Sequence, residues 1–206
     1  MKPAMEPDDL PRRALLQLIA SAFGAAALSW DWGAIAEAAH QAHATPPPSG
    51  DRTPTFFTPA EAADVEAVTA QIIPTDDTPG AREAGVVHFI DRALATFLWP
   101  LAADYRTQLV GFQAGYLAGH PEARSFASLT PAQQIAHLTE VERTPFFDTT
   151  RLLTLLGMFS MPAYGGNRDG VGWKLIGFDD QHAFQSPFGH YDRDYPGFVI
   201  DPPGTP

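Results

Sequence analysis

Apolar residues recur at helical spacing through the middle of this 206-residue chain. Between Thr58 and Pro74, the side chains of Val65, Val68 and Ile72 fall on one face of a helix, and Pro74 ends it. The same period continues in four further segments: residues 86–98, 101–117, a segment that begins at Pro131, and residues 145–159. Apolar and polar residues alternate over no useful length. The pattern therefore predicts an all-α fold, a single domain of about five helices.

Two of these helices begin with the same local signal. Thr58 and Thr130 can each act as the N-cap residue, and each is followed by a proline, which suits the first helical position. Glu61 and Gln133 stand three residues after the two caps and complete capping boxes. His120, followed by a proline, closes the helix over residues 101–117.

The last two predicted helices differ in how much apolar surface they offer. The helix that begins at Pro131 has a narrow apolar face of Ile135, Leu138 and Val141. Residues 145–159 are richly apolar, so we expect this helix to be the most buried one.

A long tail from Gly165 to Pro206 shows no periodicity and is rich in glycine, proline and aromatic residues. We expect it to be irregular. Such a segment cannot form its own core, so it must lie across the helices of this chain or across another protein, where Tyr and Trp are favoured anchors. The aromatic residues of this C-terminal part are Tyr164, Trp173, Phe178, Phe184, Phe188, Tyr191, Tyr195 and Phe198.

The first 44 residues have the pattern of an export signal. Arg12 and Arg13 stand directly before an apolar run over residues 14–28, which is shorter than the roughly 20 residues of a membrane span. A basic pair before a short apolar stretch indicates the twin-arginine route, and a small-residue site would allow a cut after Ala44. The alternatives are an uncleaved anchor and an ordinary amphipathic helix, and the acidic residues before Arg12 depart from the usual signal. Residues 45–55 then form a Pro-rich linker, and residues 56–206 form the folded body.

Composition and charge exclude several functions. The net charge is −11, and no basic patch is visible that could neutralise phosphates, so we expect no nucleic-acid partner. The chain contains no cysteine, which excludes disulfides, cysteine-ligated zinc, iron–sulfur clusters and thiol catalysis.

The stretch MPAYGGNRDGVGW, residues 161–173, invites more specific chemistry. Asn167, Asp169 and Gly170 match three positions of a calcium-binding EF-hand loop, but Gly165 and Ile176 stand where its two main carboxylates belong. A nucleotide site is excluded, because neither dinucleotide nor P-loop glycine motif occurs and no strand precedes the glycines.

The titratable residues point to no compact site. The seven histidines are scattered and form no metal-binding motif, and no GxSxG elbow accompanies them. The adjacent Asp76 and Asp77 could act as a paired acid and base, but a turn between helices explains them better. A small hydrolase that uses His182 or His190 with a nearby aspartate stays as a minor alternative.

Two long motifs stand out in the body: IIPTDDTPGAREAGVVHFIDRAL, residues 72–94, and MPAYGGNRDGVGWKLIGF, residues 161–178. Together they resemble the gluconate 2-dehydrogenase subunit 3 family. Both motifs are long and occur in the right order, and the resemblance extends over roughly residues 56–188. The twin-arginine leader is typical of the family too.

The resemblance implies a non-catalytic small subunit of an exported dehydrogenase that oxidises sugars, sugar acids or alcohols. In such complexes a large subunit carries FAD and transfers the hydride, and a separate multi-haem cytochrome c subunit often passes electrons to quinone. The small subunit has no redox centre or cofactor of its own. It stabilises the flavoprotein and takes it through the twin-arginine translocase as a folded passenger, to the periplasmic side of the inner membrane.

We therefore interpret the Gly-rich loop as a binding surface for the partner subunit. The residues that we expect to contact it are Tyr164, Gly165, Gly166, Asn167, Asp169, Gly170 and Trp173. Packing of this loop against the chain's own helices is the simpler alternative. A different class of function is a stand-alone periplasmic module whose exposed Trp173 and tyrosines stack on a carbohydrate.

Overall fold

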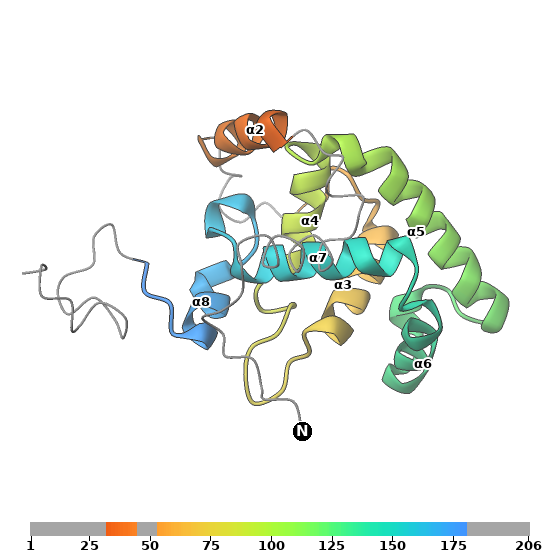
Figure 1. Cartoon of the computed structure of the whole chain (residues 1–206). Coiled ribbons are helices and arrows are strands. Elements are labelled where there is room, and N and C mark those ends of the chain that lie inside the picture. The colour runs from red at the N-terminus through yellow and green to blue at the C-terminus, as the bar shows by residue number, and fades with distance from the viewer. Residues whose placement is uncertain (1–31, 45–52, 181–206) are drawn as a thin grey trace, which may run out of the picture.

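A computed structural model describes residues 32–44 and 53–180 of the chain. In these two ranges the chain forms seven α-helices, three short 3-10 helices and no strand, which confirms the predicted all-α fold. The α-helices, labelled in Figure 1, are α2 (Trp32–Ala44), α3 (Pro59–Ile72), α4 (Val86–Ala95), α5 (Trp99–Gly119), α6 (Pro131–Val141), α7 (Pro145–Phe159) and α8 (Val171–Ile176). The 3-10 helices are η2 (Phe126–Ser128), η3 (Pro162–Tyr164) and η4 (Arg168–Gly170).

Several sequence-based predictions concern residues outside these ranges. The arginine pair Arg12 and Arg13, most of the Pro-rich segment 45–55, His182 and His190 lie outside the described residues. The same holds for the aromatic residues of the tail from Phe184 onward. Within the predicted leader, the described part is α2.

The five predicted helices are α3 to α7, and their start signals work as expected. At α3, the backbone N–H of Glu61 donates to Thr58 Oγ1 (3.3 Å), and the backbone N–H of Thr58 donates to Glu61 Oε2 (2.8 Å). The same reciprocal pair joins Thr130 and Gln133 at α6. Thr144 caps α7 in a similar way, although no capping box marks this start in the sequence.

The core lies where α3, α4 and α7 pack together, and α7 crosses the middle of the view in Figure 1. α4 and α7 approach closely at Gly157, where a methyl group would lie 3.1 Å from the side chains of Val86 and Phe89. Fully buried aliphatic side chains surround this crossing: Val65, Val68, Ile90, Leu94, Leu153 and Met158. The packing of these three helices fixes the position of the C-terminal end of α7.

The predicted helix over residues 86–98 ends earlier than expected. α4 stops at Ala95, the chain turns, and α5 begins at Trp99. Phe97 and Leu98 are buried in this turn, so their helical spacing did not reveal the break. Among the described residues, no single helix has the length and apolar character of a membrane span. α4 and α5 meet these criteria only as a pair, with a bend of 119° between them.

The buried face of α6 is more polar than predicted. Ile135 is 54% exposed, whereas Gln134 is buried together with Leu138. The reason is hydrogen bonding: the Gln134 amide nitrogen donates to the backbone oxygens of Phe126 and Leu129, and its oxygen accepts from Gln71. A buried amide with several partners can replace an apolar residue, and apolar spacing does not report it.

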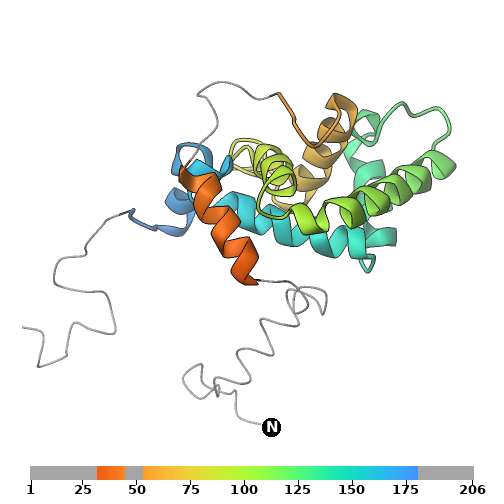
Figure 2. The same cartoon turned by 90° about the horizontal axis from the view of Figure 1, so that it is seen from above.

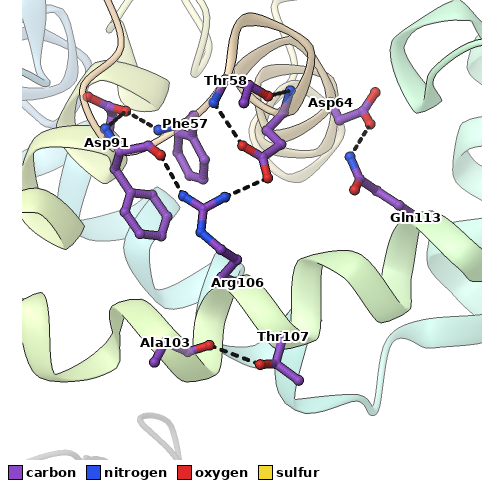
Figure 3. Close-up of polar contacts among 10 residues, drawn as sticks. Phe57, Thr58, Asp64, Asp91, Ala103, Arg106, Thr107 and Gln113 are labelled. Atoms are coloured by element: carbon purple, nitrogen blue, oxygen red, sulfur yellow. Dashed lines mark hydrogen bonds and ion pairs between the residues drawn. The ribbon is translucent and has the colours of Figure 1, made fainter.

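The buried carboxylate of Asp91 holds the segment that enters the body before α3 (Figure 3). It accepts the backbone N–H groups of Thr55 (2.8 Å), Phe56 (2.9 Å) and Phe57 (2.8 Å), and also the Thr55 hydroxyl (3.0 Å). Hydrogen bonds to an ionised acceptor are the stronger kind, so one side chain of α4 fixes three successive residues.

Arg106 of α5 secures the same segment from the other side. Its guanidinium donates to Glu61 Oε1 and to the backbone oxygen of Phe56, both at 2.6 Å, and lies 4.3 Å above the centre of the Phe56 ring. α3, α4 and α5 therefore meet at residues 55–58, which belong to the folded body.

Replacing Asp91 tests this arrangement. In Asp91→Ala, three backbone N–H groups lose their acceptor, so we expect the free energy of unfolding to fall by about 3 kcal/mol. Asp104→Ala removes an exposed carboxylate from α5 and should change it by less than about 0.5 kcal/mol. Urea unfolding of both variants measures the difference. Equal stabilities would mean that Asp91 does not hold residues 55–57 in solution.

Candidate functional site

The Gly-rich loop, residues 161–173, follows α7 directly and is more regular than predicted. It contains η3 and η4 and runs into α8. The expectation of an irregular chain from Gly165 onward is therefore wrong for residues 168–176. α8 has six residues and is flanked by the cap residues Gly170 and Gly177, both in left-handed conformation. So short a helix contains too few turns to show a helical period.

Asn167 is the centre of the loop. Its side chain is fully buried, and its backbone is left-handed at φ 43° and ψ 43°, which asparagine tolerates better than most residues. Its amide nitrogen donates to the Ser160 backbone oxygen (2.9 Å), and its amide oxygen accepts the Gly172 N–H (2.8 Å). The side chain thus ties the end of α7 to the start of α8.

The loop also supplies hydrogen-bond donors to the end of α7, where the last carbonyl groups of a helix lack partners. The Asn167 N–H donates to the Gly157 oxygen (2.8 Å). The indole nitrogen of Trp173 donates to the Phe159 oxygen (2.8 Å). Together with the bond to Ser160, three donors from the loop cap the C-terminal end of α7.

Two glycines allow the loop to come this close. A side chain at Gly166 would collide with the backbone oxygen of Gly157, and one at Gly172 would collide with that of Met158. Both obstacles are backbone atoms of α7, which cannot move aside. The loop therefore requires these glycines for close approach.

The two sequence motifs meet at this loop. The Arg168 N–H donates to the Ala84 oxygen (3.0 Å), which joins η4 to the turn before α4. A methyl group on Gly165 would lie 3.3 Å from the His88 oxygen, so this part of the loop rests on the first turn of α4. Residues 72–94 and 161–178, far apart in the chain, form one joint between α4, α7 and α8.

The remaining predicted site residues lie around this joint. The Tyr164 ring is partly buried and meets Phe97 edge-on, with 5.5 Å between the ring centres. Trp173 is also partly buried, and Asp169 is exposed on the surface. Gly165 and Gly170 are partly buried within turns. The structure thus brings all seven residues together, and the buried ones shape the loop from inside. Contact of this loop with a partner subunit stays a prediction.

Exposed and partly buried apolar side chains lie near the loop, on α7, on α8 and just after α8. Leu155 and Leu156 are 39% and 38% exposed and lie one turn before Phe159 on the outer face of α7. Trp173 reaches Phe159 through its indole nitrogen, and its ring lies 5.2 Å from that of Phe178. Ile176 stands one helical turn after Trp173 and is 59% exposed. We call these six residues the apolar strip: the exposed Leu155, Leu156, Ile176 and Phe178 and the partly buried Phe159 and Trp173.

The titratable groups of the body hold structure together. Asp64 is buried and accepts from Gln113 Nε2 (3.0 Å), the Tyr116 hydroxyl (3.1 Å) and the Ala127 N–H (3.2 Å). Burial, together with the Asp64 charge, raises the pKa of Tyr116 to about 12. Burial also lowers the pKa of His137, whose ring lies among aromatic side chains.

Asp76 and Asp77 lie in a turn between helices, as predicted. The Asp76 carboxylate accepts the backbone N–H and the hydroxyl of Thr78, and the first of these bonds is the main reason that its pKa is lowered. Its side chain folds onto its own backbone, as in a turn between helices. Within residues 32–44 and 53–180, no group of three or more His, Asp or Glu side chains is placed to hold a metal ion.

Comparison with known proteins identifies one family. The chain matches the family described as "Gluconate 2-dehydrogenase subunit 3" over residues 59–180, which includes α3 to α8 and both motifs. No curated protein and no solved structure matches the chain.

Two matched glycine substitutions test the close approach of the loop to α7. Gly172→Ala places a methyl group against the Met158 oxygen and should destabilise the protein by about 3 kcal/mol. Gly111→Ala, in an open position on α5, should stabilise it by up to about 1 kcal/mol, because alanine favours a helix. Thermal unfolding of the two variants measures both changes in stability. Equal melting temperatures would contradict the observed packing of Gly172.

Proposed function

We propose that this chain, which belongs to the gluconate 2-dehydrogenase subunit 3 family, is the non-catalytic small subunit of an exported FAD-dependent dehydrogenase of sugars, sugar acids or alcohols. Family membership over the helical body carries the proposal, because the family is named for a subunit and a subunit needs a partner. In this proposal the flavin belongs to the large subunit, which performs the oxidation.

The surface of the helical body supports a partner role. Exposed apolar residues of this size, gathered in one strip, are typical of a protein–protein interface and unfavourable in water. The joint beneath the strip is rigid, since Asn167, Trp173 and the close glycines fix α8 on α7. A rigid apolar surface loses little conformational entropy when it binds, and this favours affinity.

The proposed complex also needs a route of export. A flavoprotein folds around its cofactor before it crosses the membrane, so it needs a route that carries folded proteins. We propose that the leader of this chain, with Arg12 and Arg13, supplies this route for both subunits. Binding must then precede export, and the mature complex lies on the periplasmic side of the inner membrane, where a cytochrome c subunit can take the electrons.

Two isoleucines of similar exposure test the binding surface. Ile176 on α8 is 59% exposed and Ile135 on α6 is 54% exposed, and Figure 1 shows the two helices at opposite ends of α7. Ile176→Ser should weaken binding to the flavoprotein encoded by the neighbouring gene about tenfold, whereas Ile135→Ser should leave it unchanged. Calorimetry with the purified subunits measures both. Equal affinities would exclude α8 from the interface, even if the two subunits do bind.

Replacing the arginine pair tests whether the leader of this chain supplies the export route for the flavoprotein. Arg12→Lys with Arg13→Lys keeps the charge of the leader but removes the paired arginines that the translocase reads. We expect the flavoprotein to stay in the cytoplasm, bound to this chain, with periplasmic dehydrogenase activity reduced at least tenfold. The control, Arg124→Lys with Arg143→Lys, changes two exposed arginines of the body and should not affect export. A flavoprotein that is soluble, active and exported without this chain would refute the proposed function.

A further inference from the structure

Helix α2 packs on the body although it lies within the predicted leader. Ile35 and Ala42 are only 8% and 7% exposed and belong to the hydrophobic core, and Ala38 and Ala39 pack against that core. These four positions follow the i, i+3, i+4, i+7 spacing of one helix face. The opposite face, which includes Ala36, is exposed.

The contacts of α2 are specific. Figure 2 shows α2 lying across the body beside the segment that follows α7, and α2 contacts η3 there. Its alanines allow a close approach. Arg92 of α4 donates from Nη2 to the Ala42 backbone oxygen (2.5 Å), which lies in the last turn of α2. A cation at this end of a helix satisfies a free carbonyl and favours the helix dipole.

A cut after Ala44 would therefore remove a packed element of the domain. It would leave Arg92 without its Ala42 acceptor and expose the surface under Ile35 and Ala42. Exposing the apolar surface that α2 covers is unfavourable for a subunit that must stay folded. The packing of α2 argues against processing at this site.

A second small-residue site precedes α2. Ala25-Ala26-Ala27 has the small-x-small pattern and follows an apolar stretch over residues 14–24, directly after the arginine pair. Secretory leaders have about 15–30 residues, with an apolar region of about 7–15 residues. The apolar stretch over residues 14–24 has 11 residues and ends close to Ala27, whereas Ala44 lies 20 residues beyond its end.

We propose that the leader is cut between Ala27 and Leu28, and that α2 stays in the mature subunit as part of its fold. In this step a signal peptidase hydrolyses the peptide bond: water supplies the hydroxyl to the Ala27 carbonyl carbon and a proton to the Leu28 nitrogen. The site of the cut rests on the proposed export, whereas the retention of α2 in the fold rests on packing alone.

Intact-mass measurement of the exported subunit tests the cleavage site. The same substitution, alanine to leucine, is made separately at each of the two candidate positions. We expect a mature chain that begins at Leu28. Ala27→Leu should abolish this cut, because the peptidase requires a small residue there, and Ala44→Leu should leave it unchanged. A chain that begins at Thr45, or an exported chain that still begins at Met1, would overturn the proposed site.

The second test needs no export. Full-length protein from the cytoplasm is compared in two neighbouring variants, Ile35→Asp on the buried face of α2 and Ala36→Asp on its exposed face. We expect Ile35→Asp to lower Tm by about 5 °C and Ala36→Asp to change it by less than about 1 °C. Equal Tm values would show that α2 is not packed in solution. If the flavoprotein proves independent of this chain but the Tm values differ, the export proposal fails and the packing of α2 stands.

Discussion

The C-terminal end of α7 is the point on which the rest of the structure depends. A helix end buried in a core leaves carbonyl groups that must find donors, and here a single loop provides them through Asn167 and Trp173. The loop can do so only because Gly166 and Gly172 let two backbones come into contact. Since α7 also crosses α4 at Gly157, this one closure fixes the relative positions of α4, α7 and α8.

This constraint gives the two family motifs a physical meaning. Their glycines and the buried asparagine build a joint between segments that lie about 80 residues apart in the chain, as the bond from Arg168 to Ala84 shows. A polar side chain that is fully buried and bonded at both ends specifies one geometry, because any other arrangement leaves it unsatisfied. The exposed residues around the joint are then held in a fixed relation to each other, and these are the residues that a partner can reach.

The sequence predicted the helices of the body well, because their signals are local. Thr58 and Thr130 with their prolines mark two starts correctly, and the apolar period locates α3 to α7. The errors arise where tertiary contacts override the period: Gln134 is buried in place of Ile135, and α8 is too short for any periodicity. Helix α2 was not among the predicted helices, although Ile35, Ala38, Ala39 and Ala42 lie at helical spacing, because it falls within the predicted export leader.

The position of the Gly-rich loop in the chain could be singled out from the sequence, but the hydrogen bonds that shape the loop could not. The unusual composition of residues 161–173 marked it, whereas Asn167 donates to the backbone oxygens of Gly157 in α7 and of Ser160 just after it, and backbone acceptors have no signature in a sequence. The charge of the chain and its apolar strip both bear on the proposed role. The net charge of −11 opposes self-association of the free chain through its apolar strip, because like charges repel. In the proposed function, binding of the flavoprotein in the cytoplasm would cover that strip before export, and a surface that is unfavourable on the free chain would become the contact between the two folded subunits.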